Sequence, residues 1–185
     1  MNSRILLMLT FFVALLSPRC AHAQFGVYGE FNFAMDGSSY RDPTSMLGAT
    51  VGGYFNLARV GPLVPGLDAR GTFLMGSPFL SGSSCCGNSF HINSFLAGPK
   101  LTFRLKKGRI KPYAEFLVGV GSAAASSGES TSTGFAYQPT GGVDVALIPR
   151  FDWQLIEVSY QRGPGDNDIS NAQTGILSTG IVFHF

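Results

Sequence analysis

Apolar and polar residues alternate with a period of two along most of the chain after residue 23. In FGVYGEFNF, the apolar residues Phe25, Val27, Phe31 and Phe33 share one parity, and small or polar residues occupy the other. Such alternation is typical of a β-strand with one apolar and one polar face. The pattern recurs in seven later segments, namely LGATVGGYF, LDARGTF, GPKLTFR, YAEFLVGVG, GGVDVAL, LIEVSYQ and LSTGIVFHF. The sequence therefore predicts eight strands.

The segments between the predicted strands are rich in Gly, Pro, Ser and Asp, which favour turns and loops. Those at one end are residues 35–44, 76–89, 122–133 and 162–172, and those at the other end are residues 57–66, 105–110 and 148–151. At this second end, the segments 105–110 and 148–151 are short. Strands of about ten alternating residues, with short turns at one end and longer loops at the other, are typical of transmembrane β-barrels. Since lipid offers no backbone hydrogen-bond partners, such a sheet must close on itself.

We therefore expect an all-β fold, an eight-stranded antiparallel up-and-down transmembrane β-barrel, over residues 24–185. A soluble periplasmic ligand-binding barrel would show the same alternation with its two faces exchanged. Its solvent face would be poor in Lys and Glu, and large side chains such as Phe31, Phe73 and Phe116 would overfill its small core. Both observations favour the membrane barrel, and the soluble barrel remains the alternative.

Residues 1–23 have the features of a cleaved secretory signal peptide. Arg4 precedes an apolar run, and Ala21-His22-Ala23 forms an A-x-A cleavage site before Gln24. The apolar run is shorter than the roughly 20 residues of a membrane-spanning helix. Because Arg4 and Arg19 leave with this segment, the remaining chain has equal numbers of basic and acidic residues. The composition thus gives no reason to expect a nucleic-acid partner.

The final segment, STGIVFHF, resembles the last strand of the small OmpA-like outer-membrane β-barrel family of Gram-negative bacteria. The shared features are Ser178, Gly180, Phe183 and the terminal Phe185. The segments AGPKLTFR, KPYAEFLVGVG and GGVDVAL also resemble strands and turns of such barrels. The resemblance implies that these four residues are an assembly signal read by the barrel-assembly machinery. It also implies export to the bacterial outer membrane with outer-membrane lipid as a partner, and no peptidoglycan-binding domain is expected after Phe185.

Charged residues occur on the predicted inner face, where they need partners because burial of an unpaired charge is costly. An eight-stranded barrel encloses a space that side chains can fill, whereas a water-filled channel needs about 16 strands. We therefore expect a lumen plugged by a polar network and a structural or surface-exposed role, with a narrow ion or small-solute pore as the alternative. The expected network comprises Glu30, Asp68, Arg70, Lys100, Arg104, Glu115, Asp144 and Glu157.

A hydrolytic site would need Ser, His and an acid within hydrogen-bond reach. His91, Ser89, Ser94 and Glu115 are candidates, and some eight-stranded barrels that modify lipid A carry a His-x-Ser motif. Here the sequence is HINS, and its spacing places His91 and Ser94 on opposite faces of a regular strand. We therefore expect no enzymatic activity, with a lipid A-modifying outer-membrane enzyme as a further alternative.

Cys85 and Cys86 are adjacent in a predicted loop. Export implies an oxidising compartment, which favours a disulfide between them, although pairing between molecules or a reduced state stays open. Two cysteines are too few for a structural zinc site. We expect no metal and no cofactor.

The segment RLKKGRIK holds Arg104, Lys106, Lys107, Arg109 and Lys111. We expect a solvated turn, with binding to peptidoglycan or lipid head groups left open. Specificity for an extracellular ligand, where there is one, is expected in the four longer loops.

Overall fold

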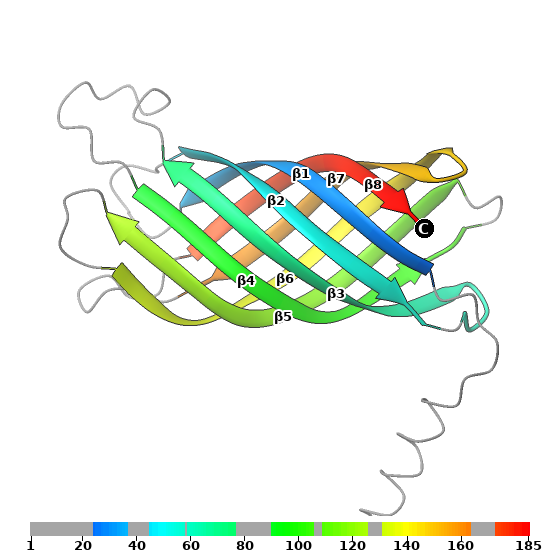
Figure 1. Ribbon diagram of the computed structural model, residues 1–185, viewed down its shortest axis with the longest axis horizontal. Coiled ribbons are helices and arrows are strands. Elements are labelled where there is room, and N and C mark those ends of the chain that lie inside the picture. Colours follow the sequence, from blue (N-terminus) through cyan, green and yellow to red (C-terminus); the bar gives the residue numbers. More distant parts are fainter. Residues whose placement is uncertain are drawn as a thin grey trace, which may run out of the picture.

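The computed structural model describes residues 24–36, 45–57, 59–76, 90–105, 109–125, 131–163 and 173–185. The described residues form a closed barrel in which every strand pairs antiparallel with its neighbour in the chain and β1 pairs with β8 (Figure 1). The strands are β1 (Gln24–Asp36), β2 (Ser45–Asn56), β3 (Leu63–Gly76), β4 (Phe90–Phe103), β5 (Ile110–Ala125), β6 (Thr131–Ile148), β7 (Phe151–Arg162) and β8 (Gln173–His184). The predicted eight-stranded antiparallel barrel is confirmed. Residues 1–23 and Cys85-Cys86, with the expected signal peptide and disulfide, lie outside the described residues.

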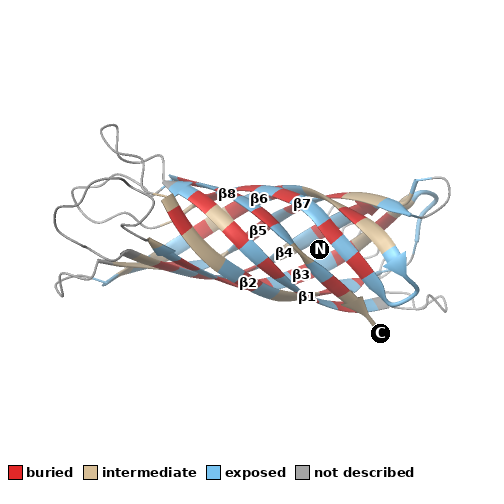
Figure 2. Ribbon diagram, turned by 90° about the horizontal axis from the view of Figure 1, so that it is seen from above, coloured by how far each residue is buried: buried red, intermediate tan, exposed pale blue. Residues whose placement is uncertain are grey.

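Buried and exposed residues alternate along each strand, which gives the wall the chequered appearance of Figure 2. The outer face carries the large apolar side chains, such as Phe31 (57% exposed) and Ile181 (59%). The inner face carries polar ones, such as Glu157 (1%). This distribution is inverted relative to a water-soluble domain and fits a barrel surrounded by lipid. None of the described residues belongs to a helix that is long and apolar enough to cross a membrane.

The connection expected at 57–66 is shorter than predicted because β3 already begins at Leu63. Val60 and Leu63 exchange backbone hydrogen bonds of 2.8 and 3.1 Å. Gly61 has a φ of +63°, a left-handed conformation that glycine adopts without steric cost. Val60, Gly61 and Leu63 thus belong to a tight turn. Pro65, which was expected in this connection, lies inside β3 opposite Leu101.

The connection expected at 122–133 is also shorter, because β5 runs to Ala125 and β6 begins at Thr131. Residues 122–124 pair with residues 131–133. These residues are small or hydroxylated, so the sequence has no apolar alternation there although the backbone pairing continues.

Strand β7 contains a β-bulge that the period-two prediction missed. The register with β8 shifts between Gln154 and Glu157, and both intervening residues, Leu155 and Ile156, face outward. Gln154 and Glu157 consequently both point into the barrel, three positions apart. Bulges re-aim side chains in this way.

Candidate functional site in the barrel interior

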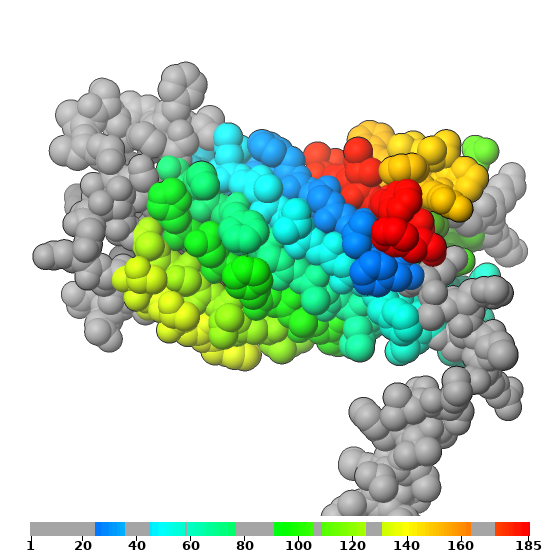
Figure 3. Space-filling view, viewed as in Figure 1, coloured from blue at the N-terminus to red at the C-terminus, as the bar shows by residue number. Residues whose placement is uncertain are grey.

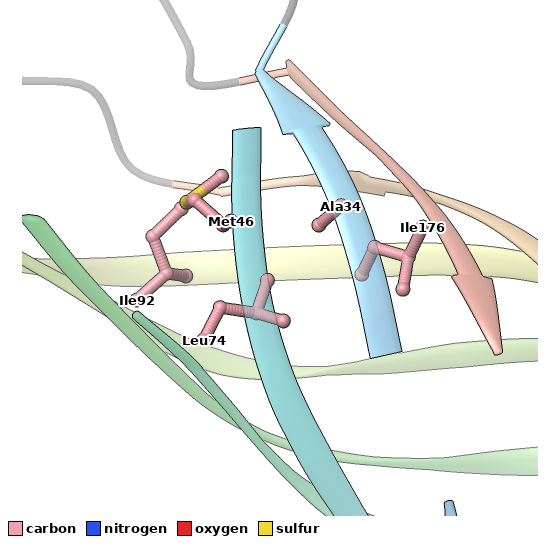
Figure 4. Packing of buried hydrophobic residues seen from close by; sticks show 5 residues of the cluster. All are labelled: Ala34, Met46, Leu74, Ile92 and Ile176. Atoms are coloured by element: carbon pink, nitrogen blue, oxygen red, sulfur yellow. The ribbon is translucent and has the colours of Figure 1, made fainter. Parts of the chain in front are cut away.

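The interior near the ends of β1 and β3 is apolar. Figure 4 shows this cluster, in which every member is at most 5% exposed. Its members are Ala34, Met46, Leu74, Ile92 and Ile176, from β1, β2, β3, β4 and β8 respectively. All lie far from the short connections 57–62, 104–109 and 149–150, which define what we call the short-turn end. Five strands contribute to this one buried cluster, and the polar side chains of Gln161 and Thr174 are buried beside Ile92 at the same end of the lumen.

The middle of the lumen is crossed by Arg70, whose guanidinium contacts three carboxylates. Its Nη1 donates to Glu157 Oε1 (2.6 Å), its Nη2 donates to Glu115 Oε2, and its Nε lies 3.3 Å from Asp68 Oδ1. Glu157 belongs to β7, which is four strands from β3 in an eight-stranded barrel and so lies on the opposite wall. The charged hydrogen bond from Arg70 to Glu157 therefore connects facing walls, and such bonds are stronger than neutral ones.

Lys100 on β4 is the second buried cation of this network. Its Nζ lies 2.7 Å from Glu115 Oε1. It also lies 4.3 Å from the ring centroid of Tyr54 and 4.1 Å from that of Tyr113. Such cation–π contacts stabilise an ammonium group most where water is excluded. The tyrosines were not among the predicted network residues, although their inward parity was visible in the sequence.

Gln154, which the bulge turns inward, connects the remaining members. Its Nε2 lies 3.0 Å from Glu30 Oε1, 2.6 Å from the Tyr113 hydroxyl and 2.9 Å from Glu157 Oε2. Tyr113 in turn donates to Glu157 Oε2 at 2.7 Å. The consecutive apolar residues Leu155-Ile156, between polar positions of different parity, are the signal that could have revealed Gln154.

Each of the three lumen tyrosines lies against a glycine of a neighbouring strand. The pairs are Tyr28 with Gly52, Tyr54 with Gly26, and Tyr113 with Gly142. A Cβ at Gly52, Gly26 or Gly142 would lie 2.5, 2.7 or 2.4 Å, respectively, from the nearest tyrosine side-chain atom. The glycines of the inner face therefore provide the space that the tyrosine rings occupy.

We expect Gly142→Ala to lower the free energy of unfolding by about 1–3 kcal/mol, as overpacking typically does. The added methyl group would displace Tyr113 from its bond with Glu157. The matched control is Gly141→Ala, because a Cβ at Gly141 would have only the Tyr113 carbonyl oxygen nearby, at 3.9 Å. Urea unfolding followed by fluorescence of the single Trp153 measures both variants. If both variants lost the same free energy of unfolding, the clash with Tyr113 would not be the cause. A change in strand flexibility would then explain the loss.

The lumen at the short-turn end contains a separate hydrogen-bonded cluster. Asp152 Oδ2 binds Lys111 Nζ and lies 2.7 Å from His184 Nε2, and His184 Nδ1 lies 3.2 Å from the Tyr54 hydroxyl. The prediction of Lys111 as part of a solvated basic turn is wrong, because its side chain is 16% exposed and turns inward to Asp152. Lys106 and Lys107 lie outside the described residues.

The structure thus buries seven of the eight expected network residues and leaves Arg104 half-buried. Asp68, Arg70, Lys100, Glu115 and Glu157 are in direct contact, and Glu30 joins them through Gln154. Asp144 is buried, and its Oδ1 has no hydrogen-bond partner among the described residues.

The candidate hydrolase residues are not brought together. Ser94 faces inward, with its Oγ 3.3 Å from Gln161 Oε1, whereas His91 has the parity of the outer face. Glu115 is held by Arg70 and Lys100 in the network. Ser89 lies outside the described residues. Within the described ranges, no group of three or more His, Cys, Asp or Glu side chains is arranged to hold a metal.

The four expected assembly-signal residues lie at the seam between β8 and β1. Ser178 is buried in the lumen, and Gly180 packs so closely on β1 that a Cβ would lie 2.3 Å from the Gly29 carbonyl oxygen. Phe185 N donates to Phe25 O at 3.0 Å. Figure 3 shows the red C-terminal part of the chain beside the blue β1.

Aromatic side chains cross this seam on the outer face. The Phe183 ring centroid lies 4.9 Å from that of Phe151 and 4.8 Å from that of Phe185, and the Phe185 ring lies 5.7 Å from that of Phe25. Rings from β7, β8 and β1 therefore form one cluster over the closure of the barrel.

Comparison with solved structures identifies similar barrels. Neisserial surface protein A superposes with a TM-score of 0.67 at 20% sequence identity, over 87% of this chain and 97% of that chain. The attachment invasion locus protein Ail of Yersinia pestis superposes with a TM-score of 0.59 at 14% identity, over 88% of this chain and 99% of that chain. The chain has the fold of the small outer-membrane β-barrels. No protein-family model matches the chain, and no curated protein matches its sequence.

Proposed function

We propose that the protein is an integral outer-membrane barrel with a closed lumen and a structural or surface-exposed role. The observation that carries this proposal is the bridge from Arg70 on β3 to Glu157 on the opposite wall. The apolar cluster of Ala34, Met46, Leu74, Ile92 and Ile176 forms a second barrier between this bridge and one mouth of the lumen. An ion would have to pass these apolar side chains and then separate bonded charges.

The outer face supports the membrane location. Large apolar side chains are exposed on all eight strands, for example Phe31, Val51, Phe95, Phe135 and Val158. In water such a surface would cause aggregation, because soluble monomers rarely expose large continuous apolar patches. Outer-membrane lipid is therefore the first partner. The short-turn end is proposed to face the periplasm, as short turns do in barrels of this fold.

The proposed partners also include the barrel-assembly machinery, through Ser178, Gly180, Phe183 and Phe185, and an extracellular ligand bound through the longer connections. One structure of the Yersinia pestis protein Ail, with a TM-score of 0.53 to this chain, is a complex with the heparin analogue sucrose octasulfate. Loops on a rigid scaffold commonly carry such binding functions.

We expect the refolded protein to show no discrete channel openings in planar lipid bilayers. The double variant Arg70→Ala/Leu74→Ala removes one side chain from each barrier and is expected to show fluctuating current. The control is Phe73→Ala, which shortens a side chain on the outer face. A slower gel mobility after boiling verifies that each protein forms a closed barrel. Steady unitary currents from the unaltered protein would contradict the closed lumen and favour the narrow-pore alternative.

A further inference from the structure

Each of the three connections at the short-turn end carries an exposed arginine. These are Arg59 between β2 and β3, Arg109 between β4 and β5, and Arg150 between β6 and β7, which together we call the basic rim. The sequence of the three connections contains no Asp or Glu. Among the described residues, no salt bridge involves a member of the basic rim. The rim is therefore a region of one sign of charge.

Backbone hydrogen bonds tie described residues of the three connections to neighbouring parts of the barrel. Arg104 N donates to Pro62 O (2.8 Å), which joins the first connection to the second. Ala146 N donates to Arg109 O (2.8 Å), and His184 N donates to Arg150 O (2.9 Å). These bonds link the second connection to β6 and the third to β8. The three arginines therefore lie at one end of the barrel, and Figure 1 shows this end beside the C-terminus.

The acidic groups nearest in the fold are turned away from the rim. Asp144 and Asp152 are buried in the lumen, and Asp152 already binds Lys111 and His184. The interior acids therefore do not neutralise the guanidinium groups on the outside.

Exposed apolar side chains alternate with the arginines along the same edge. They are Leu57, Val60, Leu105, Ile110, Leu147 and Ile148, which are 44–66% exposed. Apolar side chains beside cationic ones match the zone of a bilayer where acyl chains meet head groups. A soluble polyanion would match the charge but leave these apolar side chains in water.

We propose that the basic rim binds the phosphate groups of anionic phospholipids, such as phosphatidylglycerol, in the leaflet around the short-turn end. The guanidinium group suits this ligand because it donates two parallel hydrogen bonds to a phosphate. The apolar side chains between the arginines contact the upper part of the acyl chains. This proposal rests on the proposed insertion in a membrane, but not on a closed lumen.

The test uses the refolded full barrel in phosphatidylcholine vesicles with a trace of spin-labelled lipid. Electron spin resonance measures how strongly the protein surface selects labelled phosphatidylglycerol over labelled phosphatidylcholine. We expect a selectivity of about fivefold for the unaltered protein, since a basic residue near an anionic surface contributes about 1 kcal/mol. The triple variant Arg59→Gln/Arg109→Gln/Arg150→Gln is expected to lose this selectivity. About 1 M salt should also abolish it, because charges are then screened within about 3 Å.

Arg162→Gln is the matched control, because Arg162 lies at the opposite end of β7 and should leave the selectivity unchanged. The boiling-dependent gel shift reports whether each variant is a closed barrel, so misfolding is distinguished from lost binding. Equal selectivity in the triple variant and the unaltered protein would overturn the proposal. Retention of the unaltered protein on purified peptidoglycan, without lipid selectivity, would also overturn it and favour a cell-wall contact. A chain that never enters vesicles would instead contradict the proposed membrane location.

Discussion

Arg70→Ala is expected to lower the free energy of unfolding by about 3–5 kcal/mol, the typical effect of removing one partner from a buried ion pair. The cause is that Asp68, Glu115 and Glu157 lose the guanidinium group to which all three bind. Lys100 can compensate Glu115 (2.7 Å), but Glu157 would keep only neutral donors, Tyr113 and Gln154. Repulsion between the buried carboxylates then opposes closure of the barrel.

The measurement is urea unfolding of the refolded barrel in lipid vesicles, with Trp153 fluorescence as the signal. Arg162→Ala removes a half-buried arginine at the end of β7 and should cost less than about 1 kcal/mol, because substitutions away from buried networks have small effects. Arg70→Lys retains the positive charge but lacks the planar guanidinium group with its several donors. An intermediate loss of unfolding free energy is therefore expected. If Arg70→Ala is as stable as the unaltered protein, the bridge across the lumen does not stabilise the barrel.

Phe185→Asp is expected to abolish insertion into the outer membrane while leaving export intact. The substitution removes a ring that packs on Phe183 and Phe25, and it places a carboxylate on a side chain that is 72% exposed on the lipid side of the seam. It also alters the residue that the resemblance to outer-membrane barrels assigns to the assembly signal. Cell fractionation, with gels of boiled and unboiled samples, measures the inserted and the soluble fractions.

Phe103→Asp is the matched control, because Phe103 is an exposed aromatic residue that ends β4 at the same end of the barrel. If Phe103→Asp lowers the inserted fraction less than Phe185→Asp does, the effect at Phe185 exceeds the general cost of placing a charge at the membrane interface. Normal insertion of Phe185→Asp would show that the last residue is not part of such a signal. Recovery of the unaltered protein in the soluble fraction, without a gel shift, would favour the soluble barrel.

The fold could be predicted from the sequence because a barrel wall imposes one simple rule on every strand. Residues such as Phe31, Val51 and Phe116 must face lipid while their neighbours face the lumen, and this rule is visible as a period of two. The inward positions of Arg70 and Glu157 follow from the same rule. The bond between Arg70 and Glu157 could not be predicted from this rule. The partners that meet across a lumen depend on the registers of strands that are far apart in the chain.

Three features escaped prediction for separate physical reasons. The β7 bulge inverts the parity of the residues before it, so a period of two continued from Glu157 would place Asp152 and Gln154 on the outer face. Lys111 seemed to belong to a solvated turn, because sequence proximity to other basic residues does not show that its long side chain can reach Asp152. The apolar cluster around Met46 and Leu74 escaped prediction because the consecutive apolar residues Met46-Leu47 and Leu74-Met75 show no alternation.

The bridge between opposite walls also affects how long the barrel persists once formed. Arg70 is separated from Glu115 by 45 positions and from Glu157 by 87 positions along the chain. The bond to Glu157 exists only after β7 has joined the sheet, so it is expected to form late in folding, whereas the bond to Glu115 needs only β3 to β5. Contacts that are absent from the transition state slow unfolding without accelerating folding. The bridge would then act chiefly on the lifetime of the native state, a form of kinetic stability that suits the proposed position in the outer membrane.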